Sequence, residues 1–170
     1  LTAAELPGLD GSARAYVEAI DSVGLQTFSG SLTKPLVVRS PFTICDTSSN
    51  AVVEVSPPTT DGLRVSYFVE YPGSSIWPQR YEVVVTPERY REEIAGARTF
   101  LLKEEARKLQ ESGVGLTVTT QDLVVFGPDG PIENNLRWPD ECARHKALDV
   151  IGDLFLSGRP FHGDVTARRS

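Results

Sequence analysis

The sequence predicts an α+β fold, with helices on one face of a mainly antiparallel sheet. Residues 34–81 hold runs of β-branched and aromatic residues that end at turn residues, whereas most helical patterns come later in the chain. An order of strands followed by helices is typical of an α+β layer. A length of 170 residues with 40% hydrophobic residues is enough for one good core or two small layers.

A short helix and a group of strands come first. Ser12 follows a turn and is suited to cap a helix over residues 13–23, which Gly24 ends. Asp61-Gly62 predicts a hairpin turn between two of the strands. The strands expected in this part are residues 36–38, 51–55 and 63–69.

Helical and strand patterns mix after residue 80. Pro87 stands where the first residue of a helix is expected, and Arg98-Thr99-Phe100 ends that helix. The two strands at residues 116–119 and 123–126 are expected to belong to an inserted β-α-β element. The remaining elements are a strand at 81–86, helices at 87–97 and 103–111, a turn at 127–131 and a long helix at 139–156.

Composition excludes several classes of protein. The net charge of -6 argues against a non-specific nucleic-acid binder, although a few local Lys and Arg side chains can still hold a diphosphate. The longest apolar runs, such as residues 123–126, are far too short for a transmembrane segment. No secretory signal is recognised at the N-terminus, so we expect a cytoplasmic protein.

The cysteines and the absence of methionine bear on compartment and processing. Cys45 and Cys142 lack CxxC spacing, and we expect small buried thiols in a reducing compartment; a disulfide between them is the less favoured alternative. The chain begins at Leu1 and has no Met. These two features predict a processed product or a piece of a longer reading frame.

The long helix carries the most informative pattern. At about 100° per residue, His145, Asp149 and Asp153 lie along one side, nearly opposite an apolar stripe. An imidazole and a carboxylate one turn apart can share one metal ion, which leaves Asp153 to orient the histidine or bind substrate. A solvated polar face is the commoner explanation of such a spacing alone. The stripe consists of Ala147, Leu148, Ile151, Leu154 and Phe155.

This helix and its surroundings resemble a known enzyme family. Arg98-Thr99-Phe100 and the stretch from Leu136 to Leu154 closely resemble the zinc-dependent UDP-3-O-acyl-N-acetylglucosamine deacetylases. These enzymes take the committed step of lipid A synthesis in Gram-negative bacteria. Further matches at residues 6–13 and 163–170 keep the same order, so the resemblance runs along the whole chain.

The resemblance implies a domain organisation, a substrate and a cofactor. Residues 1–30 correspond to the end of the first domain of a two-domain fold, and residues 31–170 to the second domain without its C-terminal end. The implied reaction is hydrolytic N-deacetylation of UDP-3-O-acyl-N-acetylglucosamine with Zn²⁺ as cofactor. This chain alone would be inactive and would contact the rest of the parent chain. The alternative is a non-catalytic homologue or an isolated interaction domain.

The resemblance also assigns metal and catalytic roles. His145 and Asp149 correspond to two of the three zinc ligands, whereas the third ligand and the general-base glutamate belong before Leu1. A further catalytic histidine belongs just after Ser170. Beside these roles, we expect Asp153 to hold a catalytic histidine in its charged state through charge pairing. Thr99 matches a hydroxyl that helps to hold the oxyanion. Without the resemblance, Thr99 reads as a helix C-terminal residue bonded to the backbone.

Three further residues match substrate contacts of the family. Phe100 corresponds to an aromatic substrate contact, and core packing is compatible with that role. Lys146 and Arg169 occupy basic positions suited to the diphosphate, although Arg169 alone reads as part of a solvated tail. His162 has no counterpart, and we expect a surface histidine that binds no metal.

Two segments depart from the family pattern. Residues 113–118 stand where the family often has a Gly-rich stretch that lines the acyl-chain tunnel. Val69 takes the place of the aromatic residue expected to stack on uracil, with Phe68 and Tyr71 beside it. Acyl-chain preference and nucleotide binding are therefore the properties that the resemblance leaves open.

Overall fold

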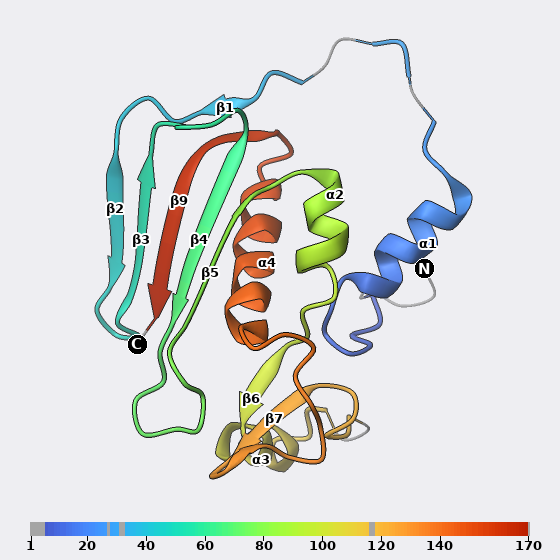
Figure 1. Cartoon of the computed structure of the whole chain (residues 1–170), viewed down its shortest axis with the longest axis vertical. Coiled ribbons are helices and arrows are strands. Elements are labelled where there is room, and N and C mark those ends of the chain that lie inside the picture. Colours follow the sequence, from blue (N-terminus) through green and yellow to red (C-terminus); the bar gives the residue numbers. More distant parts are fainter. Residues whose placement is uncertain (1–5, 27, 31–32, 116–117, 170) are drawn as a thin grey trace.

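The main sheet of the computed structural model has the strand order β2-β3-β9-β4-β5, with β1 paired to one end of β9 (Figure 1). The structure describes residues 6–26, 28–30, 33–115 and 118–169. Neighbouring strands are antiparallel, except that β9 runs parallel to β4 and β1. The strands are β1 (Leu36–Val37), β2 (Phe42–Asp46), β3 (Ala51–Ser56), β4 (Leu63–Val69), β5 (Gln79–Val84) and β9 (Phe161–Arg169).

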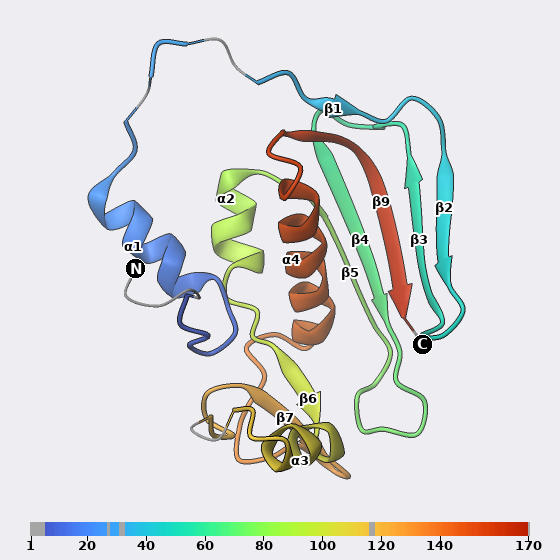
Figure 2. The same ribbon diagram turned by 180° about the vertical axis from the view of Figure 1, so that it is seen from behind.

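Helix α4 covers one face of this sheet, with α2 beside it on the same side, which confirms the predicted α+β class (Figures 1 and 2). Helix α4 packs on β4 and β5, where its buried Ala143 and Ala147 allow the helix backbone to lie close to the strands. Alternate residues of β4 point toward this layer, so that Val65 and Val69 are almost completely buried. Burial of each such side chain stabilises the fold by about 1.5–3 kcal/mol. The helices are α1 (Arg14–Val23), α2 (Pro87–Arg89), the π-helix η1 (Tyr90–Ile94), α3 (Lys103–Glu111) and α4 (Glu141–Phe155).

Helix α2 begins as the sequence predicts and ends earlier than expected. The Thr86 side chain accepts a hydrogen bond from the backbone N–H of Arg89, and Pro87 occupies the first turn. The helix then widens into η1 and closes with a turn, in which the N–H of Ala97 donates to the carbonyl of Ile94. The helix predicted over residues 87–97 therefore ends at Ile94, and the residues that follow are free to approach α4.

Helix α1 is attached to the remainder by polar contacts at both of its ends. The predicted cap, Ser12, lies one residue too early, since the capping position belongs to Ala13. Before the helix, Asp10 forms an ion pair with Arg137; within it, Asp21 pairs with Arg91. The division into residues 1–30 and 31–170 stays a prediction.

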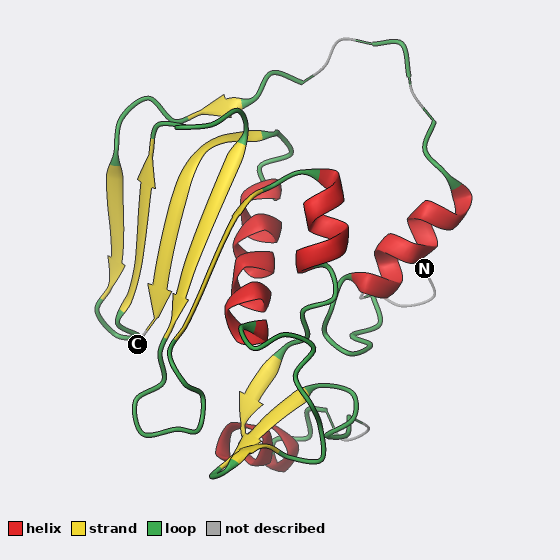
Figure 3. Cartoon of the chain, in the orientation of Figure 1, coloured by secondary structure: helices red, strands yellow, loops and turns green. Residues whose placement is uncertain are grey.

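A small second sheet contains the β-α-β element and corrects its predicted boundaries. Strand β6 (Phe100–Leu102) pairs in parallel with β7 (Val124–Gly127), as seen in Figure 3. Strand β8 (Gly130–Pro131) pairs with β7 in the antiparallel direction. Two parallel neighbours need a crossover connection between them. Helix α3 is part of that connection, because β6 precedes it and β7 follows it in the chain. The strand expected at 116–119 is wrong at Val118 and Thr119, which form no strand; Leu116 and Thr117 lie outside the described residues.

Strand β9 overturns the predicted hairpin at Asp61-Gly62. The chain does bend there, and the carbonyl of Gly62 accepts the N–H of Gly163. However, β3 and β4 do not pair with each other, because β9 lies between them and hydrogen-bonds to both. Neither β9 nor the edge strand β2 is among the strands predicted from the sequence.

The thiols and the membrane prediction have simple outcomes. Both cysteines are free; Cys142 is buried as expected, whereas the expectation for Cys45 is wrong because β2 is an exposed edge strand.

Within the ranges that the structure describes, no helix is both long and apolar enough to cross a membrane.

Candidate active site

His145 lies in the second turn of α4, and both of its ring nitrogens have a defined neighbour. Nδ1 is 3.0 Å from the carbonyl oxygen of Ala97, and Nε2 is 3.6 Å from Oδ1 of Asp149. A carbonyl can only accept a hydrogen bond, so we assign the ring proton to Nδ1. The lone pair of Nε2 is then directed toward Asp149, on the exposed side of a ring that is otherwise buried.

The start of α4 fixes this ring in the layer. The N-cap residue, Asp140, makes no side-chain capping bond. The buried Gln79 of β5 instead accepts the N–H of Ala143, two residues before His145. Glu141, one turn before His145, is also buried and is hydrogen-bonded to the loop that supplies Ala97. The imidazole is therefore held between the sheet and this loop.

Asp149 divides its carboxylate between two neighbours on the same helix. Oδ2 lies 2.6 Å from Nζ of Lys146, while Oδ1 faces His145. The Asp149 side chain remains 37% exposed, so the carboxylate can still be reached from outside. The predicted pair of residues is thus brought together, with a basic group attached.

The donor geometry fits the metal that the sequence analysis expects. Zinc holds nitrogen and oxygen ligands at about 2.0–2.2 Å in a tetrahedron, which places two ligand atoms roughly 3.4 Å apart. The separation of 3.6 Å between Nε2 of His145 and Oδ1 of Asp149 is close to this value. Across the described ranges, no group of three His, Cys, Asp or Glu side chains is arranged to hold a metal. Zinc binding stays a prediction that needs a further ligand.

Phe100 connects the second sheet to this site. Its ring meets His145, Tyr71 and Phe126 edge to face, with centroid distances of 6.3, 5.8 and 6.4 Å. Such contacts orient the imidazole as well as the phenyl ring. Core packing of Phe100, which the sequence left open beside substrate contact, is therefore present.

The two basic residues assigned to the diphosphate lie beside two tyrosines. Nζ of Lys146 is 6.0 Å from the ring centre of Tyr67, and the guanidinium of Arg169 is 5.8 Å from that of Tyr71. Burial raises the pKa of both tyrosine hydroxyls, and the charge of Arg169 opposes part of that rise. The charge of Lys146 also opposes the rise in the pKa of Tyr71, so both cations lie near this tyrosine.

Thr99 and Asp153 lie at the edges of the site. Thr99 is half-buried between Ala97 and β6, and its backbone carbonyl accepts the N–H of Val124. Asp153 is exposed, and eight residues of helix separate it from His145 by about 12 Å. The structure therefore does not bring Asp153 to His145, while the predicted pairing with a different histidine stays a prediction.

Several residues that shape the site were not predicted from the sequence. Tyr67 and the buried pair of Arg98 and Glu141 were not assigned roles, and Tyr71 was noted only as a neighbour of Val69. The spacing of Glu141 and His145, one helical turn apart, is the signal that could have drawn attention to the glutamate. Its partner is 43 residues away in sequence and is visible only in the fold.

The fold and this cluster define the class of the chain: an α+β domain whose main helix presents an imidazole and a carboxylate beside basic groups. The model of one family, described as LpxC, UDP-3-O-acyl N-acetylglycosamine deacetylase, matches residues 1–170. The chain belongs to this family, and the resemblance inferred from the helix motif is confirmed.

Individual relatives agree with the family assignment. A UDP-3-O-acyl-N-acetylglucosamine deacetylase from Solibacter usitatus is 36% identical over 167 residues, which cover 98% of this chain and 55% of the relative. The enzyme of the same name from Brucella ovis is 34% identical over 97% of this chain and 57% of its own length. That from Leptospira biflexa is 30% identical over 98% and 53%. The chain thus spans about half the length of the curated relatives it matches.

Proposed function

We propose that the chain is part of a zinc-dependent deacetylase that hydrolyses the N-acetyl group of UDP-3-O-acyl-N-acetylglucosamine in lipid A biosynthesis. The observation that carries this proposal is the placement of Nε2 of His145 opposite Oδ1 of Asp149, at a spacing that suits two ligands of one ion. Membership of the deacetylase family supports the reaction.

The residues of this chain would perform distinct tasks at the reacting centre. Zinc, when bound, polarises the acetyl carbonyl and lowers the pKa of a water molecule. His145 and Asp149 hold the ion, and the Ala97 carbonyl keeps Nε2 of the histidine free for it. Thr99 donates a hydrogen bond to the developing oxyanion, and Asp153 holds a charged histidine supplied from elsewhere in the protein.

The nucleotide part of the substrate would lie along the basic and aromatic side of the cluster. Lys146 and Arg169 provide two positive charges for the diphosphate, with Tyr71 beside them. A groove of about 450 Å³ runs from this point past Arg169 and Leu102. Contact of Phe100 with the substrate would come from its exposed part.

The acyl chain would enter the β-α-β element. A groove of about 580 Å³ lies between α3 and the second sheet, and aliphatic side chains form most of its wall. Its volume and lining suit a hydrocarbon chain. Val114, Gly115 and Val118, from the stretch that departs from the family pattern, line this groove, so acyl-chain preference depends on them. The aliphatic wall includes Leu101, Leu109, Val114, Val118, Val125 and Ile132.

A non-catalytic interaction domain is the competing function. It is favoured by the absence of a third metal-binding side chain among the described residues. The ion pair of Lys146 with Asp149, placed against His145, favours the enzyme, because an interaction surface requires only shape and needs none of these groups. A Glu-His pair upstream in the reading frame would decide for the enzyme.

The ligand assignment is tested in the full-length protein. His145→Ala and Asp149→Ala should each lower bound zinc, measured by elemental analysis, and turnover together. His162→Ala is the matched control, since that histidine also lies near a carboxylate, 3.9 Å from Asp61. The assignment fails if either ligand variant keeps normal zinc and turnover.

The 170-residue chain alone provides a second test. Equilibrium dialysis should show no tight stoichiometric zinc, because affinity falls steeply when a ligand is missing. The chain should also fail to deacetylate the UDP-sugar. One zinc retained through chelator treatment would mean that another side chain of this chain completes the site.

A further inference from the structure

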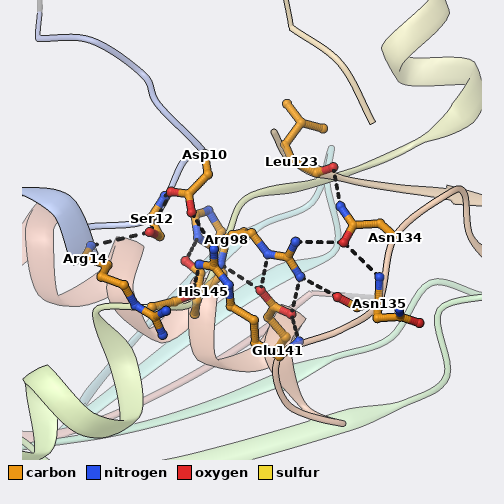
Figure 4. Close-up of polar contacts among 12 residues, drawn as sticks. Asp10, Ser12, Arg14, Arg98, Leu123, Asn134, Asn135, Glu141 and His145 are labelled. Atoms are coloured by element: carbon orange, nitrogen blue, oxygen red, sulfur yellow. Dashed lines mark hydrogen bonds and ion pairs between the residues drawn. The ribbon is translucent and has the colours of Figure 1, made fainter. Parts of the chain in front are cut away.

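A buried ion pair joins the start of α4 to the loop before β6 (Figure 4). Nε of Arg98 lies 2.8 Å from Oε1 of Glu141, and Nη2 lies 3.1 Å from Oε2. Only 5% of Arg98 and 1% of Glu141 is exposed. The bidentate geometry fixes both the distance and the orientation of the two groups.

Further hydrogen bonds satisfy nearly every polar atom of the pair. The Glu141 carboxylate accepts the backbone N–H groups of Arg98 and Arg137, at 3.1 and 2.6 Å. The guanidinium donates to the side chain of Asn134 and to the carbonyl of Asn135, as Figure 4 shows. A buried ion pair gains little stability over an apolar pair of the same shape, because desolvation offsets its attraction. Stability alone therefore does not account for it.

The position of the pair relates it directly to the candidate site. Glu141 precedes His145 by one helical turn, and Arg98 follows the residue whose carbonyl faces Nδ1 of that histidine. Thr99 is the next residue in the same loop. The ion pair thus connects the helix that carries the imidazole to the loop that orients it.

A second basic residue holds the other side of this loop. Nη1 of Arg137 donates to the carbonyl of Gly96, and its Nη2 pairs with Asp10, both at 2.7 Å. Its backbone N–H is the one that Glu141 accepts. The segment from Gly96 to Thr99 is therefore held by Arg98 and Arg137, and both of these residues hydrogen-bond to the carboxylate of Glu141.

We propose that Arg98 and Glu141 are positioning residues for His145. Their ion pair holds the carbonyl of Ala97 against Nδ1, which keeps the lone pair of Nε2 directed toward Asp149, and it sets the place of Thr99 in the same segment. The catalytic consequence rests on the proposed function, whereas the orientation of the imidazole does not.

The orientation is tested without metal or activity. ¹⁵N spectra of the metal-free full-length protein at about pH 8.5, above the ordinary imidazole pKa, report which ring nitrogen carries the proton. The His145 signals are assigned by their loss in His145→Ala. The unaltered protein should show the Nδ1–H form, and Glu141→Gln should shift His145 toward the Nε2–H form.

Asp140→Asn is the matched control. Asp140 directly precedes Glu141, and its Oδ1 lies 2.7 Å from Nε of Arg144. The substitution removes this ion pair but changes no contact of the loop that faces His145. It should lower thermal stability and leave the His145 spectrum unchanged. Arg98→Lys retains the positive charge but loses the two parallel hydrogen bonds of the guanidinium to Glu141. It should shift His145 part of the way toward the Nε2–H form, and it provides this test even if Glu141→Gln does not fold.

Kinetics of the full-length enzyme add a second readout. Glu141→Gln should lower kcat by roughly ten-fold or more per folded molecule, the scale found for residues that orient metal ligands, with little change in KM. Asp140→Asn should retain kcat. Unchanged His145 spectra in both Glu141→Gln and Arg98→Lys, with kcat losses no greater than in Asp140→Asn, would overturn the proposal. Absence of zinc binding and activity in the unaltered protein would instead reject the proposed function. The spectra would then still test whether Arg98 and Glu141 position His145.

Discussion

Nζ of Lys146 lies 2.6 Å from Oδ2 of Asp149, one turn along α4, so a basic group already occupies half of the carboxylate assigned to the metal. The ammonium group of Lys146 partly neutralises the carboxylate of Asp149, and the contact keeps this ammonium group at the edge of the site. Lys146 can therefore reach an incoming diphosphate by rotating its flexible stem, without a change in the helix.

The first prediction concerns this lysine. In the full-length enzyme, Lys146→Gln should raise KM by roughly ten-fold or more, because a hydrogen bond to a charged group contributes about 1.5–3 kcal/mol. Zinc content should remain normal. Lys108→Gln, on the exposed side of α3, is the control. Steady-state kinetics with the UDP-sugar would contradict the role if both variants had the same KM.

The second prediction separates catalysis from structure at Asp153. Because this carboxylate is exposed, Asp153→Asn should leave the fold and zinc content intact. If it holds a charged histidine, the rate should fall by roughly ten-fold or more, the scale of general acid–base effects. The alkaline limb of the pH–rate profile should move to lower pH, since loss of the negative charge lowers the imidazole pKa. The control Asp129→Asn, in an exposed turn, should change neither the rate nor the pH–rate profile. If Asp153→Asn instead unfolds the protein while its folded fraction keeps normal activity, Asp153 has a structural role.

The third prediction concerns the turn that packs on Thr99. Gly11 has φ of 70°, and a Cβ placed on it would lie 2.5 Å from Cγ2 of Thr99. Gly11→Ala should therefore cost about 1–3 kcal/mol of unfolding free energy through backbone strain. Gly8→Ala is the control, since a Cβ there meets nothing within 4 Å. Urea unfolding of both variants measures the difference; equal stabilities would show that the turn tolerates a side chain.

The fourth prediction concerns thiol reactivity. Burial raises the pKa of Cys142 to about 12, whereas Cys45 is exposed. Iodoacetamide at about pH 8 should modify Cys45 alone in the folded chain and both thiols in denaturant, since the thiolate is the reactive form. Cys45→Ser should abolish native labelling. Rapid native labelling of Cys142 would show that its helix opens readily.

The same thiol gives a direction for alkaline stability. The folded state raises the pKa of Cys142, so its neutral form is favoured by folding. The resulting contribution to stability is fully present below the unfolded pKa, about 8.5, and is lost as the pH rises through the folded value. Denaturant titrations between these limits should show falling stability, and Cys142→Ala should reduce the slope.

Elements with a strong local signal were predicted from the sequence almost to the residue. Strand β4 and helix α3 have the expected bounds, Leu63–Val69 and Lys103–Glu111, because alternation, charge pattern and flanking turn residues all agree. Strands β2, β6 and β9 were missed. Strand β2 is an exposed edge, β6 spans three residues, and β9 is defined by its place between β3 and β4. Pairing with neighbours, and not local preference, determines such strands.

The site shows the same division between local and distant information. Helical spacing alone placed His145 and Asp149 on one face, and the structure confirms their proximity. The partner of Glu141 could not be predicted, because Arg98 joins it only when the loop and the helix meet. Motif spacing thus found the two groups that share a helix face but not the distant contacts that hold them.

Strand β9 comes last among the strands and yet lies inside the main sheet, between β3 and β4. During synthesis, the β2–β3 hairpin and the β4–β5 pair must therefore wait, with the inner edges of β3 and β4 unpaired, until residues 161–169 have left the ribosome. Pairings of such high sequence separation delay the rate-limiting step of folding and expose strand edges to other chains. We therefore expect that nascent chains released before this strand are retained by chaperones or aggregate, and that refolding from denaturant slows as protein concentration promotes edge-to-edge association.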